Sequence, residues 1–510
     1  MSLAAMGCMM LLLLPLGALL ILALSQPIDA VLQHMLTHVL WDYLQGSIKL
    51  LFGASMLAAV LGVLAAWLVV IYEMPARRWL ARLLVLPLAI PAYVSAFTFT
   101  ETLGEGRMLL QVFDHWGLIL PPLDLRHTSG ASFVLGLGLY PYVYLSCLVA
   151  LTSSRSAAAL DAARLMTSSH WLLFQHVGLP MMRIPLMIGV GLVMMEVLND
   201  YGVASLYAVP TLTWAIVDAW TAMGSLDTAL KLSLLLVCMV LPLVIIERRM
   251  RQHLPRESMR ERTTKPLVCS LPLQWLFTGL LCLPILAGFI APICTLVALG
   301  GYDRSWPLFT GLDHSFLLAL FVALGVLVVA TIVEFWRVNQ FGWRQWPAYL
   351  SLSGYAVPAA AVGMGTLALS SYLSPMFSGL VGLCLALIFR FATLGAGQLG
   401  QVISGPLQRH HEQALLMGAG FGARLRHILW PMLSGPAGLA MILVAVDVIK
   451  ELPATFLLRP FGFDTLATVT FQSASLENYE AAAGPALMMT ALSLLAVTLV
   501  FPKLPKSDGK

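Results

Sequence analysis

Four acidic residues lie within apolar stretches of this 510-residue chain, and they form two pairs with the same spacing. Glu196 and Asp200 are four residues apart, and Asp447 and Glu451 repeat that spacing with Lys450 beside them. Residues four apart share one face of a helix. An ionisable group at membrane depth costs about 2.5–3.5 kcal/mol on insertion scales and normally faces a cavity or a partner.

Two interpretations of these acidic pairs remain open. In the first, Glu196, Asp200, Asp447, Lys450 and Glu451 line a translocation path near its outer end, where a cation could be passed on. In the second, the acids pair with Lys450, Arg390 or helix ends and hold a gate closed. The spacing alone does not distinguish a path from a structural network.

The composition indicates a membrane protein. Hydrophobic residues make up 59% of the chain, charged residues 11%, and the mean hydropathy is +0.87, outside the range of soluble domains. Because about 20 apolar residues span a bilayer, we expect about twelve transmembrane helices. Their approximate limits are 5–25, 46–72, 83–103, 131–152, 186–208, 228–247, 270–300, 313–334, 348–372, 377–397, 436–457 and 484–502.

The basic residues predict the orientation. With both termini in the cytoplasm, the inner segments hold 21 Lys and Arg residues and the outer loops hold four, as the positive-inside rule requires. The leader before the first stretch carries no Lys or Arg, so we interpret that stretch as a retained helix and not as a signal peptide.

An internal repeat divides the chain at an offset of 251 residues. Pro180 aligns with Pro431, Glu196 with Asp447, and Asp200 with Glu451. Acidic and proline positions coincide, which chance apolar similarity would not produce. The sequence therefore predicts a first repeat of six helices over 1–246, a basic cytoplasmic linker over 247–266 and a second repeat of six helices over 267–510.

Each repeat contains a long cytoplasmic loop, at about 155–182 and about 406–433. In both we expect a short helix, a turn and a second amphipathic segment that ends at a proline. Gly418, Gly420 and Gly422 offer turn freedom in the second copy.

These loops resemble a signature of the membrane subunits of ATP-binding-cassette importers: Glu-Ala-Ala, three residues, Gly, nine residues, Ile, one residue, Leu-Pro. The first copy has Asp161 for Glu and Thr167 for Gly, and the second has Gln413 for Ala. In that family the loop forms a coupling helix seated in a groove of the ATPase subunit. The resemblance implies an ATPase-coupling role for Asp161, Ala162, Ala163, Thr167, Pro180, Glu412, Gln413, Ala414, Gly418 and Pro431.

The resemblance further implies an all-α fold of two tandem six-helix repeats, as in type I importer permeases, in the bacterial inner membrane. The chain has no GxxxxGK[ST] sequence, so ATP would be used by partner subunits, and we expect neither enzymatic activity nor a bound cofactor in this chain. The implied partners are two copies of a cytoplasmic ATPase subunit, a periplasmic substrate-binding protein and the lipid bilayer, without nucleic acid.

A narrower resemblance gives an indication of the substrate. Residues 450–483 and 195–224 are similar to the corresponding stretches of fused ferric-iron permeases, which implies ferric iron as cargo, although no metal ligands can be named. Thiamine is the next alternative, followed by phosphonate or another anion. Two other classes remain, a major-facilitator-type secondary transporter and a membrane-embedded enzyme. The first would lack the paired loops, and for the second no HExxH or GxSxG sequence occurs.

Overall fold

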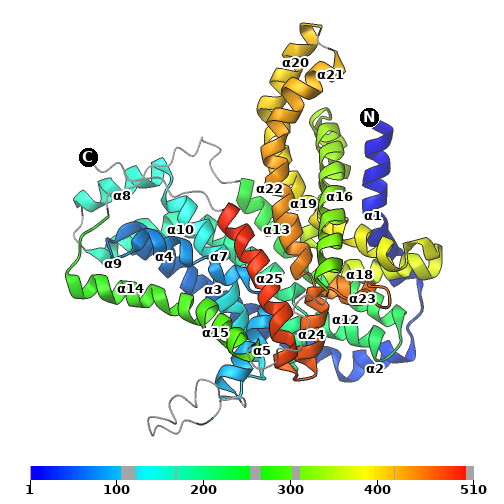
Figure 1. The fold of residues 1–510 in the computed structure, drawn as a ribbon, viewed down its shortest axis with the longest axis horizontal. Helices are drawn as coiled ribbons and strands as arrows, with labels where there is room; N and C mark the ends of the chain where they lie inside the picture. Colours follow the sequence, from blue (N-terminus) through cyan, green and yellow to red (C-terminus); the bar gives the residue numbers. More distant parts are fainter. Residues whose placement is uncertain are drawn as a thin grey trace. The chain divides into compact units, whose positions relative to one another are not determined.

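The chain folds into helices throughout the part that the structure describes. This computed structural model describes residues 2–104, 121, 123–166, 169–252, 266–300, 311–418 and 420–500. Every named element in those ranges is helical (Figure 1). The prediction of an all-α membrane protein is confirmed.

The helices of the first half follow one another in this order: α1 (Ser2–Ser25), α2 (Ala30–His38), α3 (Leu40–Ile71), α4 (Arg77–Leu83), η1 (Leu86–Ala89), α5 (Ala92–Leu103), α7 (Thr128–Leu151), α8 (Ser154–Met166), α9 (His170–Leu173), η2 (Phe174–Gly178), α10 (Leu179–Asn199), α11 (Gly202–Leu206), α12 (Leu212–Thr221) and α13 (Leu226–Gln252). Helix α13 extends six residues into the predicted linker, whose remaining part lies mostly outside the described residues.

The second half contains the following helices: α14 (Leu271–Ile285), η3 (Leu286–Ile290), α15 (Ala291–Gly300), α16 (Leu312–Val338), η4 (Gly342–Gln345), α17 (Trp346–Ser351), η5 (Gly354–Ala356), α18 (Ala359–Ala368), η6 (Leu369–Leu373), η7 (Pro375–Phe377), α19 (Gly379–Val402), η8 (Ile403–Leu407), α20 (Gln408–Leu416), α21 (Phe421–Arg424), η9 (Leu425–Leu429), α22 (Trp430–Lys450), α23 (Pro453–Leu458), α24 (Leu466–Ser475) and α25 (Tyr479–Val500).

Ten helices within the described residues are long and apolar enough to cross a membrane, or eleven if one bent pair counts as a span. The sequence predicted about twelve. The difference lies in two stretches. The stretch 83–103 is part of the bent pair, and the stretch 348–372 has α17, η5 and only a short apolar helix, Ala359–Leu373.

Proline residues explain both interruptions. The helices Arg77–Ala89 and Ala92–Leu103 meet at 95° across Pro91, so the predicted stretch 83–103 is no straight span. Pro358 precedes α18 in the same way, and the residue before each proline, Ile90 or Val357, is extended. A residue before proline is driven out of the helical region, and proline donates no main-chain hydrogen bond.

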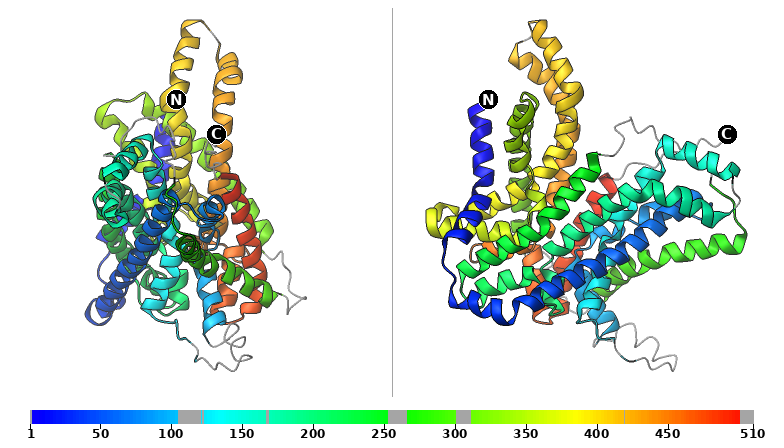
Figure 2. Two further views of the ribbon diagram at one scale, coloured as in Figure 1. Left: turned by 90° about the vertical axis from the view of Figure 1, so that its left-hand side faces the viewer. Right: turned by 180° about the vertical axis from the view of Figure 1, so that it is seen from behind.

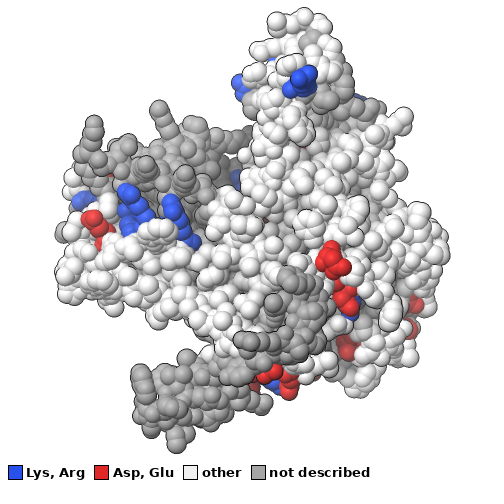
Figure 3. All heavy atoms as spheres, viewed as in Figure 1, with Lys and Arg blue, Asp and Glu red and all other residues white. Residues whose placement is uncertain are grey.

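Apolar side chains remain exposed along the spans, among them Ile21, Phe52, Met56 and Phe321. Lys, Arg, Asp and Glu occupy only small parts of the face drawn in Figure 3. A surface of this kind suits contact with lipid, since lipid tails are as apolar as the side chains that they would meet.

The chain forms two compact units, and each is assembled from three separate stretches. Unit 1 comprises Met1–Leu40, Leu212–Val240 and Pro307–Thr470, and unit 2 comprises Trp41–Thr211, Leu241–Trp306 and Phe471–Lys510. Neither unit coincides with one of the two sequence repeats. The division into repeats at 1–246 and 267–510 therefore stays a prediction about sequence, distinct from the division of the fold.

Unit 1 joins its early and middle segments through Asp29. The Asp29 carboxylate accepts hydrogen bonds from the Leu32 main-chain N–H at 2.8 Å, from Thr228 Oγ1 at 2.6 Å and from the Ser225 hydroxyl. Burial alone would raise the pKa of Asp29, but these hydrogen bonds and the nearby Lys231 hold it below its ordinary value. The carboxylate thus links the start of α2 to the start of α13.

Unit 2 joins its segments by contacts that are mostly apolar. Helix α15 packs against α5 and α25, and Thr102 Oγ1 lies 2.7 Å from Thr295 Oγ1. The Tyr93 hydroxyl reaches the Met489 sulfur at 3.6 Å. Helices from both halves of the sequence therefore share one core in this unit.

Local structure repeats between the halves at the offset found in the sequence. Adding 251 to the bounds of α7, α9, η2 and α10 gives the bounds of α19, α21, η9 and α22. Both copies also contain a π-helical turn, Phe174–Gly178 and Leu425–Leu429, immediately before the span. The second arms of the two loops and the spans that follow them thus have the same local fold.

Helix α1 depends on a close approach to α18 in unit 1. A Cβ atom added to Gly365 would lie 2.2 Å from the Pro15 carbonyl oxygen, whereas one added to Gly397 in α19 would meet nothing within 4 Å. We expect Gly365→Ala to lower the free energy of unfolding by about 1–3 kcal/mol, because main-chain atoms must shift to admit the methyl group. Thermal unfolding of the purified protein measures this.

Gly397→Ala is the matched control, since it adds the same methyl group to a helical glycine. It should leave stability unchanged or raise it slightly through helix propensity. Equal unfolding temperatures for the two variants would contradict the close packing of α1 on α18.

Candidate functional site

The second predicted coupling loop is a helical hairpin. Helix α19 passes through η8 into α20, the chain turns, and α21 and η9 lead into α22. Figures 1 and 2 show this hairpin extending past the end of α16, with α20 and α21 at its tip. Gly418 follows α20 with φ +75°, a left-handed conformation that favours glycine. The expected helix and glycine turn are present here.

An apolar cluster anchors the base of this hairpin. Leu399, Ile403, Leu407 and Leu429 are buried together with Ala330 of α16. The cluster joins both arms of the hairpin to a neighbouring span. Movement of the tip relative to the spans is therefore resisted where the loop begins and where it ends.

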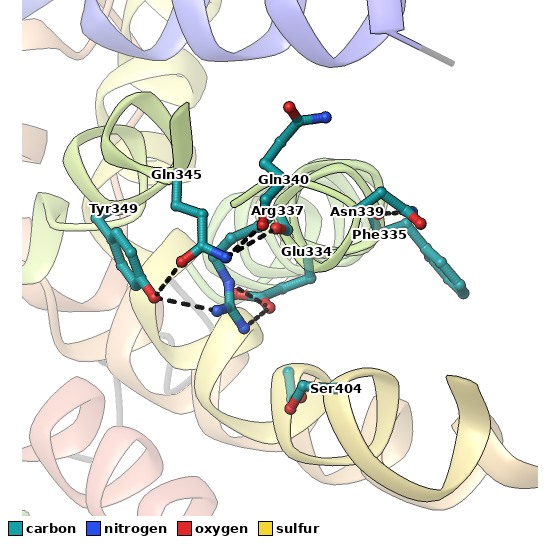
Figure 4. A network of polar contacts seen from close by, with 9 residues as sticks. Glu334, Phe335, Arg337, Asn339, Gln340, Gln345, Tyr349 and Ser404 are labelled. Atoms are coloured by element: carbon teal, nitrogen blue, oxygen red, sulfur yellow. Dashed lines mark hydrogen bonds and ion pairs between the residues drawn. The ribbon is translucent and has the colours of Figure 1, made fainter. Parts of the chain in front are cut away.

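A polar network closes the neighbouring turn between α16 and α17 (Figure 4). The buried Glu334 carboxylate pairs with Arg337 at 2.6 Å, and Arg337 donates to the Tyr349 hydroxyl at 3.2 Å. Gly400 of α19 lies so close to Glu334 that an added Cβ would be 3.0 Å from Oε2. This network fixes the end of α16 against the helix that leads into the hairpin.

The first loop passes through α8, α9 and η2 into α10, but Thr152 and Ser153 separate α8 from α7, whereas α19 continues without a break through η8 into α20. Asp161 forms an ion pair with Arg164 at 3.6 Å on α8. Gly178 lies against the ring of Trp67, which a Cβ atom would approach to 2.3 Å, so this loop is seated on α3. Thr167, the predicted counterpart of the signature glycine, lies outside the described residues.

The predicted coupling residues differ in their exposure. Ala162, Pro180, Gln413, Gly418 and Pro431 are exposed. Asp161 and Ala163 are partly buried, and Ala414 is buried. Glu412 lies within α20. Each loop therefore offers a surface that a partner could contact, and the coupling role of these residues stays a prediction.

Asp200 and Glu451 have the same structural role in the two halves. The Asp200 carboxylate accepts hydrogen bonds from the main-chain N–H groups of Val203 and Ala204, at 3.0 and 3.2 Å. These groups belong to α11, a short helix that begins directly after the span. Asp200 thus caps α11 and satisfies donors that the broken helix would leave unpaired.

Glu451 caps α23 in the same way. Its carboxylate accepts from the main-chain N–H groups of Ala454 and Thr455, both at 2.9 Å, and from the Thr455 hydroxyl. The Arg390 Nη1 atom lies 3.5 Å from Glu451 Oε1. Because these caps end α10 at Asn199 and α22 at Lys450, the predicted spans 186–208 and 436–457 extend too far at their ends.

The other members of the acidic pairs have a different environment. Asp447 forms an ion pair with Lys450 at 3.7 Å, and the side chains keep 33% and 20% of their exposure. Glu196 is partly buried in α10. The contacts that the structural interpretation required, to helix ends, Arg390 and Lys450, are present, whereas the path itself is untested.

A polar cavity in unit 2 was missed by the sequence analysis. It has a volume of about 170 Å³ and is lined by Phe97, Thr100, Arg126, Ser205, Leu206, Ala474, Ser475, Glu477 and Tyr479. Arg126 pairs with Glu477 at 2.7 Å and donates to the Tyr479 hydroxyl at 3.3 Å. The partners are separated by about 350 residues in the sequence, so no local pattern could have revealed them.

The comparisons with known proteins point to transport. No family model matches the chain. It is 26% identical over 207 residues to the sulfate transport system permease protein CysW of Escherichia coli strain K12, and the match covers 38% of this chain and 65% of that protein. The same protein of E. coli O6:H1, strain CFT073, gives the same values.

The chain is thus similar to a transport permease. It matches less than two thirds of the length of these relatives. Together with the multi-span fold, the similarity supports a multi-pass inner-membrane protein that resembles importer permeases. It gives no indication of ferric iron.

The capping role of Glu451 predicts a specific loss of stability. We expect Glu451→Ala to lower the free energy of unfolding by about 1–3 kcal/mol, because three hydrogen bonds are lost and main-chain donors at the start of α23 stay unsatisfied. Thermal unfolding in detergent measures the effect, with Asp447→Ala as control. Because Asp447 is partly exposed and caps no helix, its replacement should change stability by less than about 1 kcal/mol. A larger loss for Asp447→Ala than for Glu451→Ala would contradict this assignment.

Proposed function

We propose that this chain is the membrane-spanning permease subunit of an ATP-binding-cassette importer. The observation that carries the proposal is the pair of helical loops, whose second arms share their local fold at an offset of 251 residues and whose residues resemble the coupling signature. The similarity to a sulfate transport system permease supports the same function.

The partners in this proposal follow from the two loops. Each loop would seat in a groove of one cytoplasmic ATPase subunit, so one chain engages two copies, and ATP is bound and hydrolysed by those subunits. A periplasmic binding protein would deliver the substrate. Both termini lie in the cytoplasm in this arrangement, in agreement with the distribution of Lys and Arg.

The proposed mechanism is alternating access. ATP binding draws the ATPase subunits together, and the coupling loops carry that movement into the spans. In the second half, the loop is helical from α19 to α22 apart from one turn, and its base is packed. A helical hairpin anchored in this way passes displacement to its spans, because packed cores are bistable and not continuously deformable.

Two substrates are supported by different observations. Ferric iron is implied by the resemblance of 450–483 and 195–224 to fused ferric-iron permeases. A small oxyanion is favoured by the similarity to a sulfate permease. Thiamine and phosphonate share the machinery but have no separate support, and a major-facilitator-type secondary transporter is the alternative from another class.

Uptake in whole cells tests the function. We expect cells that lack this protein to lose uptake of either radiolabelled ferric iron or radiolabelled sulfate, in a strain without other importers for both. Depletion of ATP should stop the same uptake, whereas a protonophore should not while ATP remains. Uptake that continues after ATP depletion would overturn the mechanism.

Variants at the loop surfaces connect this uptake to coupling. Ala162→Arg combined with Gln413→Arg places a long cation on each exposed loop and should reduce uptake at least about tenfold, since small residues permit close helix contact with a partner. Ala222→Arg, at an exposed alanine outside both loops, is the control and should leave uptake intact. Equal uptake by both variants would exclude a coupling role for these surfaces.

The path hypothesis is best tested without disturbing the helix caps. We propose that Glu196 and Asp447 contact the substrate in passage, while Asp200 and Glu451 act through the caps. Glu196→Gln with Asp447→Asn should then abolish uptake at an unchanged protein level, and the exposed Asp313→Asn should not. Normal uptake in the double variant would exclude the path role.

A further inference from the structure

Arg390 of α19 is a buried cation whose hydrogen-bonding capacity is only partly used. The residue retains 6% of its exposure. Its Nε and Nη1 atoms donate no hydrogen bond to any residue that the structure describes. A buried guanidinium normally uses its N–H groups, because an unsatisfied buried donor costs free energy that folding must offset.

Glu451 does not satisfy the hydrogen-bonding capacity of Arg390. The Arg390 Nη1 atom lies 3.5 Å from Glu451 Oε1, an ion pair without hydrogen-bond geometry. The same carboxylate already accepts three hydrogen bonds from Ala454 and Thr455. Glu451 therefore compensates the charge of Arg390 while its N–H groups stay available.

The other nearby carboxylate is also engaged. Asp447 is paired with Lys450 at 3.7 Å. The neighbourhood thus holds two cations and two carboxylates, and one of the cations, Arg390, has donors to spare. Asp447 and Lys450 keep a third and a fifth of their side-chain exposure, so the described residues do not fully enclose this group of charges.

The first half of the chain shows what the cap requires. At the offset that superposes α7 on α19, Leu139 takes the place of Arg390, and Asn199 takes the place of Lys450. Asp200 nevertheless caps α11 through Val203 and Ala204. An arginine is therefore not needed to hold the acidic cap, and Arg390 has another role.

We propose that Arg390 contacts an oxyanion during transport, through the N–H groups that the protein leaves unused. Arginine suits this task because its guanidinium stays charged and presents several donors to the oxygens of sulfate-like groups. The site lies in unit 1, beside the capped start of α23, and only the second half of the chain carries it. This inference rests on the proposed permease function and specifies an oxyanion as the class of substrate.

Equilibrium binding of radiolabelled sulfate, phosphate and molybdate to the purified full chain in lipid nanodiscs tests the proposal at constant ionic strength. We expect saturable binding of at least one anion, weakened about tenfold or more by Arg390→Gln and by Arg390→Leu, which copies the first half. Arg390→Lys should bind between wild type and Arg390→Gln, because the charge remains but the number of directed donors falls.

Arg459→Gln is the matched control, since Arg459 also belongs to unit 1 and is paired with Asp464. It should bind as the wild type does. Saturable binding that is unchanged in the Arg390 variants, or no saturable binding of any of the three anions by the wild type, would overturn the proposal. If Arg390→Gln does not fold, as judged by its unfolding transition without anion, the Arg390→Lys comparison decides.

The whole-cell uptake experiment keeps this inference separate from the permease function. If uptake depends on ATP but anion binding does not depend on Arg390, only the oxyanion site is excluded. If uptake does not depend on ATP, the importer mechanism is excluded, whatever the binding data show.

Discussion

Main-chain N–H groups at a helix break need an acceptor, and in an apolar setting there is little water to supply one. Asp200 and Glu451 meet this need at equivalent points, each by accepting hydrogen bonds from a short helix that follows a span. At the breaks before α5 and α18 no acceptor is needed for one main-chain position, because Pro91 and Pro358 have no N–H group. The interrupted helices of both units depend on these four residues.

The same constraint explains how the second of the two predicted coupling loops can be both exposed and helical. A loop of irregular backbone would have to solvate its own polar groups, whereas a helical hairpin satisfies most of them internally. Among the described residues of the second loop, only Gly418 has a left-handed conformation. The apolar cluster around Leu407 and Leu429, with the Glu334–Arg337 pair beside it, then holds the hairpin at its base.

Much of this local structure could be predicted from the sequence, because it depends on periodicity, prolines and an internal repeat. The offset of 251 residues, found from acidic and proline positions, also relates the helix bounds. The ends of α10 and α22 could not be predicted. In the sequence, Asp200 and Glu451 lie within apolar stretches, and only the structure shows their hydrogen bonds to the following helices. The interleaved units were equally inaccessible, because contacts such as that of Asp29 with Thr228 join segments far apart in the chain.

The differences between the halves are more informative about function than their shared features. What they share is backbone geometry, namely the caps, the π-helical turns and the bounds of the second loop arms. What differs is charge, since Leu139 and Asn199 correspond to Arg390 and Lys450.

A third difference lies in the turns before α13 and α25. Gly224 lies two residues before α13 with φ +65°, while Glu477 lies two residues before α25 with φ +58° and pairs with Arg126. A left-handed conformation costs a residue other than glycine about 1 kcal/mol or more. Glu477 thus holds a charged side chain at that cost beside a polar cavity. Like Arg390, it is a charge of the second half that the shared backbone does not require. The two halves therefore share local backbone structure and differ in the charges that they carry.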